Sequence, residues 1–253
     1  MLWLAVWLCP GGPAAAAPAA DTPTGAAVRV ARALDGDTLV LDDGRHVRLI
    51  GINAPELGKK GAPDEPLARE AHAALVALIP RDKLVFLVPG KEPHDRYGRV
   101  LAHVFLADGR ALQEVLLQQG HGFLVVIPPN LHYLARYRRA EASARGQALG
   151  VWRHPYFVPV ASNRLGKAQT GFRRVRGRIA KTWSSRNYFY FALSPKMAIM
   201  VPRKNWGHFS GRPEGLLDTE VVARGWLTVY RDMLRMRVGH PAMLEQVKTG
   251  NTF

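Results

Sequence analysis

Three short segments decide how this chain is interpreted: Asp35-Gly36-Asp37-Thr38, then Arg48-Leu49-Ile50-Gly51-Ile52-Asn53-Ala54-Pro55-Glu56, and later Asp95-Arg96-Tyr97-Gly98-Arg99. The first is an acidic turn, since Asp and Gly favour turns. The second ends an apolar run with an amide and a glutamate, and the third adds another arginine. Carboxylate oxygens, two guanidinium groups and a lone glutamate are the groups that phosphodiester cleavage uses.

The pattern around these segments predicts a barrel. Alternating apolar residues predict strands at 28–34, 38–41 and 46–52, and Asp42-Asp43-Gly44-Arg45 predicts a tight hairpin. Apolar spacing then predicts a helix at 67–79, strands at 83–88 and 99–106, and helices at 111–119 and 133–148. Five strands with a helix between the third and the fourth is the order of an OB-fold barrel.

A second unit follows a Pro-rich stretch. Residues 155–170 are expected to be a linker, and strands are expected at 173–180, 188–193, 198–202, 221–229 and 234–238. The fold class is therefore mainly β with α: a five-stranded OB-fold barrel with three helices, followed by a second small OB-like β-barrel. The expected domains are residues 21–154 and 171–253.

The charge is high and unevenly distributed. The net charge is +15, yet residues 1–160 contribute only +3, and residues 161–253 hold 17 Lys and Arg against 5 Asp and Glu. Such a charge favours a polyanionic partner, either nucleic acid or an anionic membrane surface. The alternative interpretation is a generally basic proteome with no specific partner.

The first twenty residues are uncharged, with an apolar run at 1–8 and an Ala-rich stretch up to Ala20. This is typical of a signal peptide, although it lacks the positive start. The run is too short to span a membrane, so no transmembrane segment is expected. The single cysteine, Cys9, lies within it, and a mature chain without cysteine suits a secreted or periplasmic protein.

The polar residues of the first two segments suggest a cation site, because oxygen-only ligands suit Ca²⁺ or Mg²⁺ rather than zinc. Arg48 and Arg99 would clamp a phosphate, and Glu56 would be the general base. Each residue also has a plain structural interpretation: Arg48 as a solvated strand residue, Glu56 as a loop charge, and Arg99 as an ion partner of Asp95. The joint occurrence of all three favours the site.

These three segments, together with 112–120 and the helix that ends at Gly150-Val151-Trp152, closely resemble the thermonuclease (staphylococcal nuclease-like) family over about residues 28–154. The resemblance implies an OB-fold nuclease with three helices that cleaves DNA and RNA with Ca²⁺. It implies Asp37, Asn53 and the Ala54 carbonyl as metal ligands, with Asp35 an acid at the edge of the metal. Arg48 and Arg99 are implied to stabilise the transition state, and Glu56 to activate water.

Two departures from the family pattern alter these expectations. Asn53 replaces the usual aspartate, which predicts weaker Ca²⁺ binding or a different ion preference, with Mg²⁺ an option. Residues 123–127 lack the tyrosine that the family places beside the nucleotide, which predicts weaker base stacking there.

In the second unit, arginines alternate with aromatic residues, as in OB folds that bind single strands. The alternative is that the aromatics form the core and the arginines a solvated surface. The candidate nucleic-acid-binding residues are Arg173, Arg174, Arg176, Arg178, Trp183, Tyr188, Tyr190, Arg203 and Lys204.

The hypothesis is thus a monomeric, exported, metal-dependent nuclease with DNA and RNA as partners. The first alternative is a catalytically weak nucleic-acid-binding protein, which the lost charge at Asn53 favours and the retained Arg48, Glu56 and Arg99 oppose. The second is a basic protein that adheres to anionic lipid or cell wall, for which no basic amphipathic helix of membrane type is found.

Overall fold

The computed structural model describes residues 25–59, 61–166 and 168–247. The expected signal peptide and Cys9 lie outside these residues. Within them, no helix is long and apolar enough to cross a membrane.

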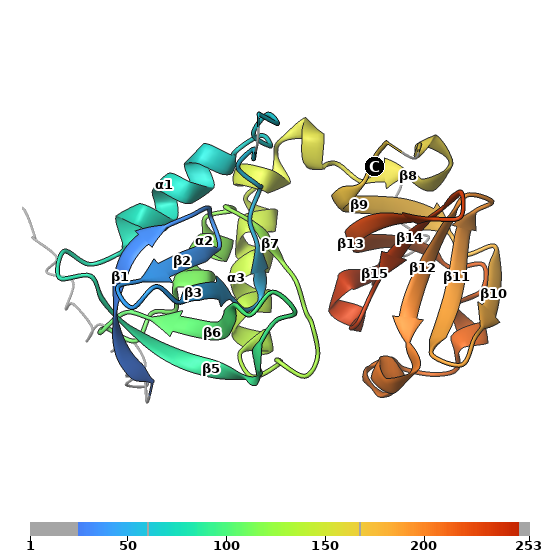
Figure 1. Ribbon diagram of the computed structural model, residues 1–253. Coiled ribbons are helices and arrows are strands. Elements are labelled where there is room, and N and C mark those ends of the chain that lie inside the picture. Colours follow the sequence, from blue (N-terminus) through green and yellow to red (C-terminus); the bar gives the residue numbers. More distant parts are fainter. Residues whose placement is uncertain (1–24, 60, 167, 248–253) are drawn as a thin grey trace, which may run out of the picture.

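The first region is a closed barrel with the strand order β1-β2-β3-β6-β5 (Figure 1). Neighbouring strands are antiparallel except for β3 and β6, which are parallel. Inward-facing residues such as Val30, Leu39 and Val47 are fully buried, as the alternating pattern requires. The strands are β1 (Ala26–Ala33), β2 (Thr38–Leu41), β3 (His46–Leu49), β5 (Leu84–His94) and β6 (Val100–Phe105).

Three α-helices accompany this barrel: α1 (Ala68–Leu78), α2 (Leu112–Gln118) and α3 (Leu134–Gly146). Helix α1 lies between the third and fourth barrel strands in the chain, which confirms the predicted OB-type order. A short helix, η1 (Gly150–Trp152), follows α3.

The single strand predicted at 46–52 is wrong. Strand β3 stops at Leu49, and the chain turns at Gly51, whose φ of +91° is open to glycine but costly for other residues. A separate strand, β4 (Ile52–Asn53), then pairs with β7 (Phe123–Leu124) outside the barrel. This turn carries Asn53 and the residues after it away from the barrel wall.

The second region is a curved sheet with the order β10-β11-β12-β14-β13-β9-β8, with β15 added to β13. Strands β9 and β10 follow each other in the chain and together correspond to β1 of the first barrel, because β10 pairs with β11 and β9 pairs with β13. With this correspondence the strand order is the same as in the first barrel, including one parallel pair, β12 with β14. Assignment of this region to an OB-like class stays a prediction. Its main strands are β9 (Gly171–Arg178), β10 (Lys181–Ser184), β11 (Tyr188–Ser194), β12 (Met197–Pro202), β13 (Glu220–Tyr230), β14 (Met233–Arg237) and β15 (Leu244–Gln246).

The stretch predicted as a linker belongs in part to this sheet. Strand β8 (Val160–Ala161) pairs in parallel with β9 and forms one edge of the sheet. Short helices flank it and punctuate the later turns: η2 (Pro155–Phe157), η3 (Ser162–Arg164), η4 (Arg203–His208), η5 (Pro213–Leu216) and η6 (Pro241–Met243).

The two regions share a packed interface. The Phe123 and Phe172 rings stack at 5.5 Å between centroids, and the Val126 N–H donates to the Met243 sulfur at 3.3 Å. Figure 1 shows β13 and β15 on the side of the second region that is turned towards the first, and β10 on the far side. The second region is therefore docked on the first.

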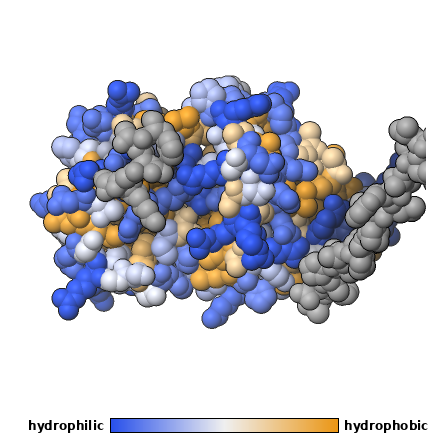
Figure 2. All heavy atoms as spheres, turned by 180° about the vertical axis from the view of Figure 1, so that it is seen from behind, coloured by the Kyte–Doolittle hydropathy of each residue, from blue (hydrophilic) through white to orange (hydrophobic). Residues whose placement is uncertain are grey.

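Seen from behind in Figure 2, hydrophilic side chains cover much of the surface, interrupted by small apolar patches.

Candidate functional site

Asp37, at the start of β2, links the first two sequence segments. The residue is only 3% exposed. One carboxylate oxygen accepts a hydrogen bond from the Ala54 N–H at 2.9 Å, and the other accepts one from the Thr38 hydroxyl at 3.1 Å. Asp35 accepts the backbone N–H of Asp37 at 3.0 Å, so the acidic turn fixes both carboxylates beside the Asn53–Glu56 loop.

Arg48 lies opposite Thr38 in the β2–β3 pair. Its Nη1 donates to the carbonyl oxygens of Leu49 at 2.7 Å and Ile52 at 2.8 Å, which are the two ends of the Gly51 turn. Its Nη2 lies 3.0 Å from Asp37 Oδ2 and 3.4 Å from Asn53 Oδ1. The guanidinium is thus held by the turn, and its Nη2 points at two of the three predicted metal ligands, Asp37 and Asn53.

The acids of this cluster influence each other's protonation. The pKa of Asp37 is raised to about 7, first by burial, against the opposing charge of the Arg48 guanidinium, and with smaller contributions from the charges of Asp35 and Glu56. The pKa of Glu56 is also raised, by partial burial first and then by Asp35, while Lys59 lowers it. Glu56 itself is half exposed, 3.8 Å from Lys59. A raised pKa suits a carboxylate that accepts a proton near neutral pH.

The donor atoms here fit a hard divalent cation. A carboxylate oxygen of Asp37 and the amide oxygen of Asn53 both converge on the positive charge of Arg48 Nη2. The Ala54 carbonyl lies beside them, 3.4 Å from the Asn53 amide nitrogen. Oxygen ligands of this kind suit Ca²⁺ or Mg²⁺. Among the described residues, no group of three or more His, Cys, Asp or Glu side chains forms a cluster of metal-binding type.

Arg99 has a local partner. Its Nε lies 2.7 Å from Asp95 Oδ2, and its guanidinium carbon lies 5.6 Å from the centre of the Tyr97 ring. Arg99 is therefore an ion partner of Asp95, as in the plain structural interpretation of this residue. Within the described part of the chain, no hydrogen bond or ion pair joins Arg99 to Asp37, Asn53 or Glu56. It does share a cavity with Arg48.

That cavity, of about 450 Å³, lies between the two regions. The first region contributes Arg48 and Arg99 to its wall, and the second contributes Lys204, Trp226 and Arg237. With Arg96 the lining holds five cationic side chains against two acids, Glu92 and Asp95, so its net charge is positive and favours anions, and the Trp226 ring lies among them.

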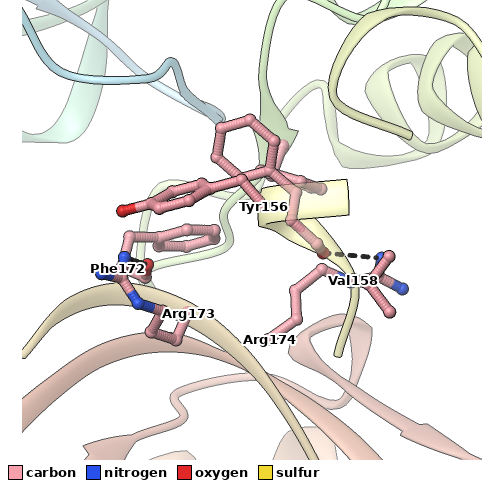
Figure 3. Close-up of a pocket in the computed structure, with 7 residues that line it drawn as sticks. Tyr156, Val158, Phe172, Arg173 and Arg174 are labelled. Atoms are coloured by element: carbon pink, nitrogen blue, oxygen red, sulfur yellow. Dashed lines mark hydrogen bonds between the residues drawn. The ribbon is translucent and has the colours of Figure 1, made fainter. Parts of the chain in front are cut away.

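The predicted nucleic-acid-binding residues fall into separate groups. Arg173 and Arg174 lie at the interface, where Figure 3 shows them against Tyr156 and Phe172. Arg173 lies 3.5 Å from Glu65, and Arg174 is 4.8 Å from the Trp152 ring centre. Burial lowers the pKa of Arg174 to about 10. These contacts anchor β9 on the first region.

The remaining residues of that set lie on the second region. Arg176 pairs with Glu220 at 2.7 Å, and Arg178 donates to the Asp218 carbonyl. The aromatic residues Trp183, Tyr188 and Tyr190 gather on β10 and β11, with the first and last stacked at 5.0 Å. Arg203 lies over the Phe189 ring at 4.4 Å, and Lys204 lines the cavity.

Sequence reasoning missed three residues of the second region that matter for this site. Trp226 and Arg237 line the cavity, and Arg224 is buried in an ion pair with Glu141. The only available signal was a charged residue inside the apolar stretch 221–229, since a buried arginine requires a partner. The identity of that partner depends on tertiary packing.

The family of this chain is established by comparison. A family model described as "Staphylococcal nuclease homologue" matches residues 46–154. "Thermonuclease" of Staphylococcus intermedius is 34% identical over 126 residues, which is 49% of this chain and 74% of that protein. "Thermonuclease" of Staphylococcus hyicus is 33% identical over 127 residues, again 49% and 74%.

"Endonuclease YncB" of Bacillus subtilis (strain 168) is 32% identical over 135 residues, or 52% of this chain and 64% of that protein, slightly under two thirds of its length. The residues matched by the family model include Arg48, Asn53, Glu56 and Arg99, and Asp37 lies nine residues before the match begins. Through this first region, the chain belongs to the staphylococcal nuclease homologue family.

Proposed function

We propose that this chain is a nuclease that hydrolyses phosphodiester bonds of DNA and RNA with the help of a divalent cation, Ca²⁺ or Mg²⁺. The observation that carries the proposal is the convergence of Asp37, Asn53 and Arg48 at one point, beside a cationic cavity. Family membership and the names of the relatives, thermonuclease and endonuclease, support it.

Arg48 has the role best supported by geometry. Its Nη1 is held by two carbonyls, so the side chain is pre-oriented, while its Nη2, which is paired with Asp37, would donate to a phosphate oxygen in place of that carboxylate. Hydrogen bonds to the equatorial oxygens grow stronger as negative charge develops there. Arg99 lines the same cavity and would supply a second guanidinium once the substrate draws it from Asp95.

Glu56 is proposed as the general base. It is half exposed, so water reaches it, and its raised pKa favours taking a proton from that water. Asp37, Asn53 and the Ala54 carbonyl would hold the cation, which when bound would add positive charge beside the phosphate. We further propose that the protein is exported, to the periplasm or the medium, and acts as a monomer.

A digestion assay tests the proposal. Plasmid DNA, a single-stranded oligonucleotide and RNA are each incubated with the wild type and Glu56→Ala, in Ca²⁺, in Mg²⁺ or with chelator. We expect cleavage by the wild type with a cation, none with chelator, and a loss of about a hundredfold or more in Glu56→Ala. Glu214→Ala, which changes an exposed glutamate on η5, is the matched control. Binding without cleavage under every ion would instead favour a nucleic-acid-binding protein of this fold.

A further inference from the structure

A row of side chains crosses the second region on the outer face of its sheet. The register pairs Trp183 of β10 with Tyr190 of β11, Tyr190 with Met200 of β12, and Met200 with Arg237 of β14. Paired residues on neighbouring strands point to the same face of a sheet. Trp226 of β13 follows, next to the Leu227–Met236 pair that joins β13 to β14.

The alternate row confirms which face is outside. Phe191, Ile199, Met236 and Leu227 are the residues one step along the same strands, and each is at most 1% exposed. The row from Trp183 to Arg237 therefore faces away from the core. Trp183 is 36% exposed.

One end of this row lies in the cavity of the candidate site. Arg237 and Trp226 line that cavity together with Arg48 and Arg99. The other end, Trp183, lies on β10, the strand at the far side of the second region (Figure 1). The row thus leads from an aromatic pair, of which Trp183 is exposed and Tyr190 half-buried, to the cavity that Arg48 and Arg99 line.

The chemistry along the row suits an unpaired nucleic-acid strand. The Trp183 and Tyr190 rings are parallel within 4° and leave flat surfaces for stacking bases. Arg235, in the next outward row, lies 4.0 Å from the Tyr230 ring centre and 5.7 Å from that of Tyr190, which places a cation beside the aromatics. Alternating aromatic and cationic groups bind the bases and the backbone of single strands.

We propose that this row is a track on the second region that holds a single strand of the substrate on one side of the scissile bond. This inference rests on the proposed function and extends it to the surface that holds the strand. Five strands spaced about 4.8 Å apart give a track of about 19 Å from Trp183 to Trp226. That length accommodates about four nucleotides, the lower end for an OB-type surface. Bases in a duplex are paired and stacked on each other, so they cannot lie on these rings.

The test measures kcat/KM for single-stranded oligothymidylates of two, four, six and eight nucleotides in Ca²⁺. We expect the wild-type value to rise with length and level off near six nucleotides. The double variant Trp183→Ala/Tyr190→Ala should reduce the ratio of the eight-nucleotide to the two-nucleotide value at least tenfold, because each lost base stack weakens binding by about that factor. Leu217→Ala, which truncates an exposed apolar residue elsewhere on the second region, should keep the wild-type ratio.

A second variant tests the cationic end of the track. Affinity for the eight-nucleotide strand is measured at several salt concentrations, and log affinity is plotted against log salt concentration. Arg237→Gln should make the slope of this dependence less steep by about 0.7, the value for one phosphate contact on a single strand. Arg212→Gln, which removes an exposed arginine elsewhere on the second region, should leave that dependence unchanged. Affinity is measured with chelator present, so that cleavage does not interfere.

The outcomes separate this inference from the proposed function. If the wild type cleaves neither the shortest nor the longest strand, the nuclease proposal fails. If it cleaves both and the double variant keeps the wild-type length ratio, the track is wrong while the nuclease stands. A wild-type ratio near one overturns the track as well.

Discussion

Arg224 of the second region and Glu141 of helix α3 form a buried two-point ion pair. The Nη1–Oε1 distance is 2.6 Å and the Nη2–Oε2 distance is 2.8 Å. The same Glu141 carboxylate accepts the N–H of Leu124 at 2.7 Å, and Leu124 pairs with Ile52, the residue before Asn53. One carboxylate therefore joins the second region to the strand that carries a predicted metal ligand.

Breaking this pair should destabilise the whole chain. Arg224→Met leaves the Glu141 charge buried without its partner, and we expect a loss of about 3–5 kcal/mol in the free energy of unfolding, measured in urea. Adding Glu141→Gln should recover part of the loss, because the amide oxygen still accepts from Leu124. Arg176→Met, at an exposed pair, should cost less than about 1 kcal/mol. Equal losses in the two arginine variants would refute the assignment.

Asn53→Asp should strengthen cation binding. The substitution places a second negative charge beside Asp37, and Ca²⁺ affinity depends on the number of charged ligands. We expect about tenfold tighter Ca²⁺ binding by calorimetric titration. Asn163→Asp, an exposed site on η3, adds the same charge and should change nothing. Tight wild-type binding that Asn53→Asp does not improve would contradict the role of Asn53.

Gly51→Ala should disrupt the turn that positions Arg48. Gly51 has a φ of +91°, and an added Cβ would lie 2.6 Å from the Tyr137 ring. Gly44 has a similar φ of +83° but no atom within 4 Å of a new Cβ. We expect a cost of about 1 kcal/mol at Gly44→Ala from the backbone alone, and at least about 2 kcal/mol at Gly51→Ala. Equal costs by thermal unfolding would show that Tyr137 yields freely.

Stability should fall in mild acid because of His103. Burial, and then the nearby His132, lowers the pKa of His103 from 6.5 to about 4, and its Nδ1 lies 2.8 Å from the Tyr137 hydroxyl. Between these two pH values the unfolded chain binds a proton on His103 more tightly than the folded chain does. The contribution of neutral His103 to the free energy of unfolding is therefore fully present above pH 6.5 and is lost as the pH falls towards 4.

For His103→Gln, the decline between pH 7 and 4.5 should be smaller than in the wild type by about 2 kcal/mol. His121 and His240 also have lowered pKa values. Because wild type and His103→Gln both keep these two histidines, the difference between their declines reports His103 alone. An unchanged decline in the variant would assign the effect to those other histidines.

The parts of the fold that local pattern controls were predictable from the sequence. The β2 strand and helix α1 follow from alternation and helical spacing, and the β2–β3 hairpin explains why Asp37 and Arg48 come together. The Gly51 turn was missed because an apolar run hid a glycine with positive φ. The Arg224–Glu141 pair spans 83 residues, and no local pattern specifies such a contact.

The roles of the candidate site residues were inferred from resemblance, and the structure adds their surroundings. It brings Asp37, Arg48 and Asn53 into contact, whereas Arg99 is held by the nearby Asp95. The cavity wall formed by Arg237 and Trp226 could not be foreseen, because it depends on how the two regions dock.

The most direct test of the central claim is the single-turnover rate of phosphodiester hydrolysis of an end-labelled oligonucleotide in Ca²⁺, for wild type, Glu56→Gln and the control Glu70→Gln. Glu70 is an exposed acid on α1. The proposed role predicts cleavage by wild type and Glu70→Gln at similar rates and a loss of about a hundredfold or more in Glu56→Gln. Equal rates in all three proteins, or no hydrolysis by the wild type, would contradict it.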